Sequence, residues 1–259
     1  MLLQEFRVPI ELNLSPEEIG KLVGFLGYGN PSAPVWFIGI EEGIGGMTPD
    51  DESYNLKARS RFDTIMDLHR AHLLLQENGR PIDIKHNPPS TQVWQYMAKI
   101  MLARRNEFEC APENREAVVK NRKAVHHYIG HKLGRAGNET FLTELKPFPQ
   151  RAAHLGDLQA RFQAADPSLE TKISARRAAL RGLLKNRDDR QLVICYGAAA
   201  GWRNQFESLL DVKFGPLAAK SKIEKSPDSQ VILLPFFGYG RMSHGVISEL
   251  AASGLLPKA

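Results

Sequence analysis

The sequence predicts an α/β protein with three layers, α/β/α, in which helices cover both faces of a central, mainly parallel four-stranded sheet. Four segments have the continuous apolar character of strands that are buried on both faces. These segments are residues 33–40, 139–149, 190–197 and 229–240. Helical patterns follow the third and fourth segments directly, and this strand–loop–helix alternation is typical of a parallel sheet with crossover connections.

Four segments outside the long stretch between the first and second strands have helical patterns. Residues 15–27 open with an N-cap serine, a proline at the first helical position and glutamates in the first turn. Residues 168–187 combine an apolar stripe with a basic opposite face, which is typical of a helix packed on a sheet. Residues 197–210 and 243–256 predict helices that begin at strand tips, with Ser243 as the N-cap of the last helix.

A long segment separates the first strand from the second. Amphipathic patterns over residues 61–75 and 91–105 predict two helices in this segment. No linker-like run divides the segment from its surroundings. We therefore expect one domain over residues 1–259, with a helical insertion at approximately residues 50–137.

The composition of the chain argues against a membrane protein, a secreted protein and an iron–sulfur protein. No apolar run approaches the roughly 20 residues of a membrane span, and the N-terminus lacks the pattern of a signal peptide. The two cysteines, Cys110 and Cys195, cannot supply the four ligands of an iron–sulfur cluster. We expect a cytoplasmic protein with no membrane partner, no metal and no other cofactor.

Positive charge is unevenly distributed in a chain whose net charge is +5. Basic residues gather in residues 118–137 and 172–190. Each stretch is either a solvated helix face or part of a surface that binds a phosphate backbone. The sequence leaves both readings open.

The tip of the first strand is rich in glycine and carries two adjacent acids, Glu41 and Glu42. Its glycines do not have the spacing of a dinucleotide-binding loop, and no Gly-Lys-Ser/Thr follows them as in a phosphate-binding loop. Ligands of open α/β sheets bind at the carboxyl ends of strands. Glu41 is therefore either a turn residue without a ligand or the acid of a binding site.

Three strand tips together resemble motifs of the uracil-DNA glycosylase superfamily. The stretch "GIEEG" at residues 39–43 lies where that family has its first motif. The stretch "LTELKPFP" at residues 142–149 is similar to the middle motif, and "LLPFFGYGRMSHG" at residues 233–245 lies where the last motif is expected. The resemblance implies that fold, and it implies excision of a base from DNA.

The resemblance also implies site residues. Glu41 takes the position of the water-activating Asp or Asn, Glu144 falls where a base-reading Asn is expected, and Phe236 or Phe237 replaces the motif histidine. The implied catalytic residues are Glu41 and His244. The implied base-binding residues are Gly39, Gly43, Glu144, Phe148, Phe236 and Phe237, and the implied DNA-backbone contacts are Gly45, Gly46, Tyr239 and Arg241.

Three functions agree with these features. The first is a divergent uracil-DNA glycosylase-like enzyme that hydrolyses the N-glycosidic bond of a damaged or deaminated base in single-stranded DNA or a damaged duplex. The second is a catalytically inactive module of the same fold that binds nucleic acid or a nucleotide. The third is an unrelated α/β hydrolase or transferase that acts on a nucleoside-like molecule.

Overall fold

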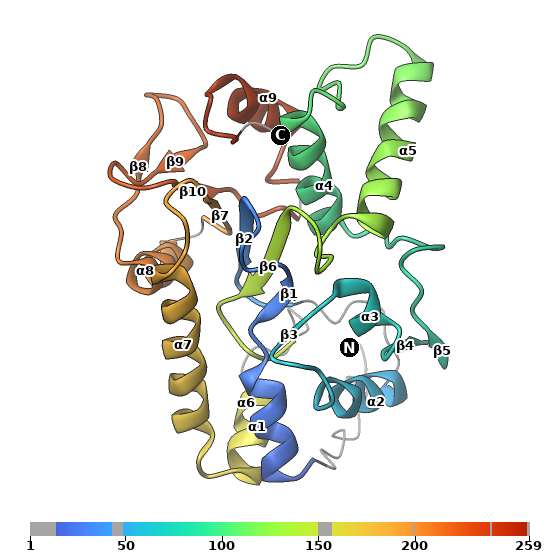
Figure 1. Cartoon of the computed structure of the whole chain (residues 1–259), viewed down its shortest axis with the longest axis vertical. Helices are drawn as coiled ribbons and strands as arrows, with labels where there is room; N and C mark the ends of the chain where they lie inside the picture. Colours follow the sequence, from blue (N-terminus) through green and yellow to red (C-terminus); the bar gives the residue numbers. More distant parts are fainter. Residues whose placement is uncertain (1–13, 43–48, 150–156, 199, 239, 258–259) are drawn as a thin grey trace, which may run out of the picture.

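The computed structural model describes residues 14–42, 49–149, 157–198, 200–238 and 240–257 (Figure 1). The helices are α1 (Pro16–Gly24), α2 (Pro49–Arg59), α3 (Leu68–His72), α4 (Gln92–Arg104), α5 (Arg115–His131), α6 (Asp157–Ala165), α7 (Leu169–Lys185), α8 (Ala200–Leu210) and α9 (His244–Ala252). The strands are β1 (Gly27–Gly29), β2 (Val35–Gly39), β3 (Ile65–Met66), β4 (Gln76–Glu77), β5 (Arg80–Pro81), β6 (Thr140–Glu144), β7 (Leu192–Tyr196), β8 (Gly215–Pro216), β9 (Glu224–Lys225) and β10 (Val231–Leu234). Across the described part of the chain, no helix combines the length and the apolar character needed to cross a membrane.

The main sheet is mixed and has eight strands among the described residues, in the order β3-β1-β6-β2-β7-β10-β9-β8. The four strands expected from the sequence are adjacent, and β6, β2, β7 and β10 pair in parallel. Antiparallel pairing joins β1 to β6, β9 to β10 and β8 to β9. The expectation of a four-stranded sheet is therefore corrected to a larger mixed sheet. The added strands escaped prediction because two or three residues are too few to show a periodic pattern.

Both faces of the central strands are covered by helices (Figure 1). Along β2, Val35 and Phe37 contribute to one hydrophobic cluster, while Trp36 and Ile38 contribute to another on the opposite face. The first cluster includes side chains from α3, α4, α5 and α9, and the second includes side chains from α7 and α8. Burial on both faces explains why these strands are continuously apolar in sequence.

A third hydrophobic cluster joins α1, α2, α6 and the beginning of α7. In it Phe148, which follows β6, stacks on Phe162 with ring centroids 4.7 Å apart. Helix α1 begins as predicted, because Ser15 and Glu18 form a reciprocal capping box. The cluster positions α1 and α7 next to the end of β6.

The expected helical insertion differs from the observed segment. The prediction of a helix over residues 61–75 is wrong, since only α3 is helical there and the preceding β3 pairs with β1 of the main sheet. Asp67 ends the extended segment, because its carboxylate accepts hydrogen bonds from the first N–H groups of α3. The apolar residues of this stretch thus belong first to a strand and then to a short helix.

The insertion also contains a hairpin, β4–β5, that the sequence analysis missed. Asn78 and Gly79 form its turn with φ of 52° and 71°. The carboxylate of Asp51 accepts hydrogen bonds from both of their N–H groups. An Asn-Gly pair is a strong hairpin signal, and it was available in the sequence.

Candidate functional site

The order of the parallel strands indicates where a ligand site belongs. From β2 the chain continues to β6 on one side, whereas from β7 it continues to β10 on the other side. In open α/β sheets, ligands bind outside the carboxyl ends of the strands at such a reversal of direction. The reversal falls between β2 and β7, and the parallel strand β6 ends at the same edge of the sheet.

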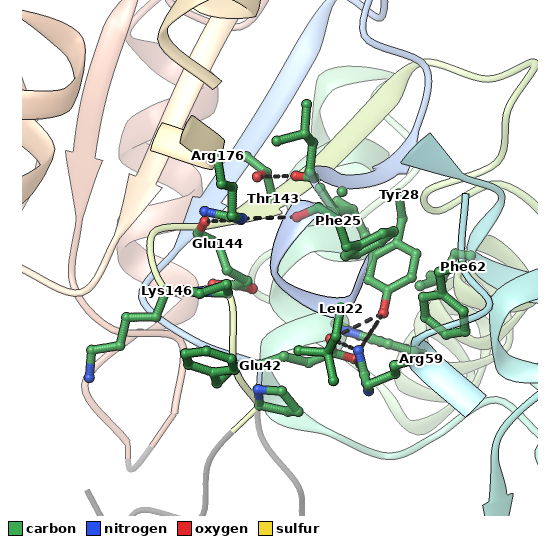
Figure 2. Close-up of a pocket in the computed structure, with 18 of the residues that line it drawn as sticks. Leu22, Phe25, Tyr28, Glu42, Arg59, Phe62, Thr143, Glu144, Lys146 and Arg176 are labelled. Atoms are coloured by element: carbon green, nitrogen blue, oxygen red, sulfur yellow. Dashed lines mark hydrogen bonds and ion pairs between the residues drawn. The ribbon is translucent and has the colours of Figure 1, made fainter. Parts of the chain in front are cut away.

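A pocket of about 50 Å³ lies at this edge, next to the ends of β2 and β6 (Figure 2). Its wall is mostly apolar and includes Leu22, Phe62 and Phe148. The polar residues that line it are Tyr28, Glu42, Arg59, Thr143, Glu144, Lys146 and Arg176. This volume holds a few water molecules, so a larger occupant enters only if lining side chains move.

Glu144 lies at the tip of β6 and has an unusual environment for a carboxyl group. The hydroxyl of Tyr196 donates a hydrogen bond to its Oε1 at 2.9 Å. Its Oε2 is buried and has no hydrogen-bond partner among the described residues. Burial raises the pKa of Glu144 to about 8, and the charge of Glu42 adds to this effect, while the Tyr196 hydrogen bond opposes it. Glu144 is therefore mainly protonated at neutral pH.

Gly39 makes room for the contact between Glu144 and Tyr196. It pairs with Glu144 across the β2–β6 ladder. A Cβ atom at Gly39 would lie 2.0 Å from Oε2 of Glu144 and 2.2 Å from the hydroxyl of Tyr196. A side chain at this position would therefore force the two residues apart.

Glu42 lines the same pocket but is held as a carboxylate. The two terminal nitrogens of Arg59 donate to its two oxygens at 2.7 and 2.8 Å, and the Tyr28 hydroxyl donates to them at 3.1 and 3.2 Å. Burial opposes the charge of Glu42, but Arg59 outweighs it, so the pKa of Glu42 lies below its ordinary value. Bidentate pairing of this kind fixes both the charge and the orientation.

Glu41 is the neighbour of Glu42 but does not line the pocket. Its Oε2 accepts a hydrogen bond from Nζ of Lys146 at 2.9 Å. That ammonium also lies 4.6 Å from the centre of the Trp202 ring. Lys146 thus links Glu41 to the pocket wall, since Lys146 itself is a lining residue.

Arg176 from α7 is buried beside Glu144, yet it donates to main-chain carbonyl groups (Figure 2). Its acceptors are the carbonyl oxygens of Phe25 at 2.9 Å, Glu144 at 2.8 Å and Leu145 at 3.2 Å. Burial lowers the pKa of Arg176 to about 10, while Glu144 opposes this shift. Arg176 therefore fixes the backbone at the end of β6 and keeps its positive charge at neutral pH.

His244, expected to share the site with Glu41, lies elsewhere. It is the first residue of α9 and is exposed, and it does not line the pocket. Its Nε2 is 3.3 Å from Nζ of Lys99, and its ring packs edge-on against Phe108. Burial and the nearby Lys99 lower the pKa of His244. The structure thus does not bring Glu41 and His244 into one pocket.

The remaining expected site residues fall into three groups. Phe148 lines the pocket, whereas Phe237 is buried and stacks on Tyr196 with ring centroids 4.5 Å apart. Phe236 is half-buried against the core, and Arg241 is exposed. Gly43, Gly45, Gly46 and Tyr239 lie outside the described residues. For all of these residues, the expected roles stay predictions.

Sequence reasoning missed Tyr28, Arg59, Tyr196 and Arg176. Arg176 had a detectable signal, because Ile173, Arg176 and Leu180 follow one another at spacings of three and four residues. Such spacing places Arg176 on the apolar face of α7 rather than on its basic face. For Tyr28 and Arg59, the sequence carries no comparable signal.

The described residues contain no group of three or more His, Cys, Asp or Glu side chains placed to hold a metal ion. Comparison of the chain with protein-family models, with curated proteins and with solved structures found no match. Its function is therefore inferred from the site.

Proposed function

We propose that the protein is a divergent uracil-DNA glycosylase-like enzyme, with a three-layer α/β/α fold in a single domain, that hydrolyses the N-glycosidic bond of a damaged or deaminated base in DNA. One observation carries the proposal. Glu42 and Glu144 line one pocket at the strand tips, and their environments keep one charged and the other neutral. Acids whose pKa values are separated in this way are typical of sites that perform acid–base chemistry.

Base recognition follows from the neutral state of Glu144. A protonated carboxyl group offers one donor and one acceptor, as the carboxamide of Asn does. Glu144 stands where the family resemblance implies a base-reading Asn. Its protonation supports the same type of hydrogen bonding to the edge of a flipped base. Phe148 supplies an apolar wall of the pocket.

Glu41 is the proposed catalytic carboxylate. In this proposal it orients a water molecule toward C1′ of the sugar and accepts a proton from that water as the C–O bond forms. Lys146 holds the carboxylate in place at 2.9 Å. The base leaves from the pocket that Glu42 and Glu144 line.

The proposed partner is single-stranded DNA or a damaged duplex, met in the cytoplasm. The outward face of α5 supports a polyanionic partner. Lys120, Lys123, His127 and His131 are exposed there, and their spacing places them on one side of the helix. The two lysines of this face attract a phosphate backbone through counterion release.

A test uses labelled oligonucleotides that contain uracil or hypoxanthine, in single strands and in duplexes. Base release is measured under single-turnover conditions by alkaline cleavage of the abasic product. Glu41→Gln is expected to slow release on the order of 100-fold. The control Glu113→Gln, at an exposed position, leaves the rate unchanged. Unchanged release by Glu41→Gln excludes the catalytic role, and no release by the native protein from any substrate excludes the enzyme.

The second candidate is a catalytically inactive module that binds nucleic acid or a nucleotide. It is favoured by the position of Phe237. The resemblance implies that Phe236 or Phe237 replaces the motif histidine, and Phe237 is a buried core residue. This candidate predicts binding that weakens steeply with salt, without abasic product. Binding of a nucleoside that does not respond to salt would instead indicate a small-molecule enzyme.

A further inference from the structure

Three cations line the pocket together with Glu144, yet each donates its hydrogen bonds to another acceptor. Arg59 is engaged with Glu42, and Lys146 with Glu41. Figure 2 shows the Lys146 ammonium pointing away from Glu144, and Arg176 bonded to carbonyl oxygens. A buried carboxylate without a paired cation is strongly disfavoured, so this arrangement retains the neutral acid.

The hydrogen-bond pattern also indicates which oxygen carries the proton. Oε1 accepts a hydrogen bond from Tyr196, whose own pKa is raised by burial and by Glu144, so that its hydroxyl stays protonated. Oε2 has no hydrogen-bond partner among the residues that the structure describes. The acidic hydrogen therefore belongs on Oε2, which packs against Gly39 and meets a ligand only when the lining side chains of the pocket move.

We propose that Glu144 is the general acid that protonates a ring nitrogen of the departing base, and that the substrate base is consequently a purine. This inference rests on the proposed glycosylase function and extends it to the class of substrate. Tyr196 is a positioning residue, because it holds Oε1 and leaves the proton on Oε2.

The C1′–N bond breaks and its electron pair moves to the base, while the Glu144 proton is transferred to a ring nitrogen of that base. The oxygen of water bonds to C1′, and the proton of that water passes to Glu41. Solvent then restores the proton on Glu144 and removes the proton from Glu41, so that the net reaction is hydrolysis.

The three cations that line the pocket already pair with other groups, and this explains why we expect a purine as the substrate base. A neutral purine has ring nitrogens, N3 and N7, that accept a proton without a change of tautomer. A pyrimidine such as uracil has no unprotonated ring nitrogen besides the one that leaves, so it departs as an anion, which a cation free to pair with it stabilises best. Among the described lining residues, Arg59, Lys146 and Arg176 already donate to other groups.

The experiment compares Glu144→Gln with the native protein on two leaving groups. Gln keeps the size and hydrogen bonding of the side chain but has no proton to transfer. Release of hypoxanthine is expected to fall on the order of 10²- to 10⁴-fold. Release of 7-methylguanine, which is already cationic, is expected to fall less than about 10-fold by the same reasoning. The native rate on hypoxanthine should also decline above pH about 8, and the variant should lack this decline.

Two controls separate the possible failures. Glu113→Gln should match the native protein on both substrates, and the thermal midpoint reports whether Glu144→Gln is folded. If Glu144→Gln does not fold, Tyr196→Phe replaces it. The Tyr196 hydrogen bond lowers the pKa of Glu144. Its loss in Tyr196→Phe should therefore raise that pKa and move the alkaline decline of the rate to higher pH.

The outcomes are distinct. Equal slowing of both leaving groups by Glu144→Gln, or an unmoved pH profile in Tyr196→Phe, overturns the general-acid role while base excision stands. A native protein that releases uracil faster than hypoxanthine overturns the purine assignment alone. A native protein that releases no base at all overturns the proposed function and this inference with it.

Discussion

Near the tips of β2 and β6, two glutamates line the same pocket and each accepts a hydrogen bond from a tyrosine, but one is charged and the other is neutral. At the β2 tip, Glu42 accepts from Tyr28 and is ionised. At the β6 tip, Glu144 accepts from Tyr196 and is mainly neutral at pH 7. The tyrosines do not account for this difference, since each donates to its glutamate.

Two arginines account for the difference in charge between Glu42 and Glu144. Arg59 directs two nitrogens at the carboxylate of Glu42, whereas Arg176 directs its nitrogens at three carbonyl groups although it lies beside Glu144. A nearby cation therefore stabilises a buried carboxylate mainly when its N–H groups point at it. Substitutions at the two strand tips test this difference.

Removing the arginine at the β2 tip should have the largest effect. Arg59→Met leaves the half-buried Glu42 without its cation, and we expect the free energy of unfolding to fall by about 3–5 kcal/mol. Urea denaturation at pH 7 measures this change. Adding Glu42→Gln to the variant should recover part of the loss, and Arg70→Met, at an exposed arginine, should cost about 0.5 kcal/mol or less. A loss below about 1 kcal/mol for Arg59→Met contradicts the role given to this pair.

Filling the space between the two strand tips should have the next largest effect. Gly39→Ala places a methyl group 2.0 Å from Glu144 Oε2, so we expect a loss of about 2–3 kcal/mol of unfolding free energy. The control is Gly182→Ala within α7, where no atom lies within 4 Å of the new Cβ. That helical substitution should stabilise the protein by up to about 1 kcal/mol. If Gly39→Ala is as stable as Gly182→Ala, the contact between Glu144 and Tyr196 is not constrained by Gly39.

The neutral state of Glu144 predicts a pH dependence of stability. Its folded-state pKa of about 8 exceeds the ordinary value of 4.5, so between these pH values the folded state binds more protons than the unfolded state. Stability should therefore fall as pH rises through this window, by about 1.4 kcal/mol per pH unit at most. Glu144→Gln should remove this contribution, which urea denaturation between pH 5 and about pH 8 measures. Parallel pH profiles of the native protein and Glu144→Gln would show that Glu144 is ionised.

The ion pair between Glu41 and Lys146 should contribute least. Lys146→Met removes the contact with Glu41 and the contact with Trp202, for an expected loss of about 1 kcal/mol. Lys21→Met, which removes the exposed pair with Glu17, is the control and should cost about 0.5 kcal/mol or less. Raising the salt concentration should reduce the difference between the native protein and Lys146→Met. A loss comparable to that of Arg59→Met would mean that Glu41 depends on its cation as strongly as Glu42 does.

Elements with long, regular patterns were predictable from the sequence. It located β2, β6, β7 and β10, since strands covered on both faces are continuously apolar. It also predicted α1 from its cap and α4 from its amphipathic pattern. These signals lie within one segment of chain, so no knowledge of distant neighbours is needed to interpret them.

The charge states of the two pocket glutamates were not predictable from the sequence, because they depend on contacts between distant segments. Glu42 meets Arg59 across 17 positions, and Glu144 meets Tyr196 across 52. The sequence predicted Glu41 and His244 as the catalytic residues, but neither lines the pocket. The glutamates that line it are Glu42 and Glu144. The charge of a buried acid depends on which donors reach it and on how much water remains, and both are set by packing between distant segments.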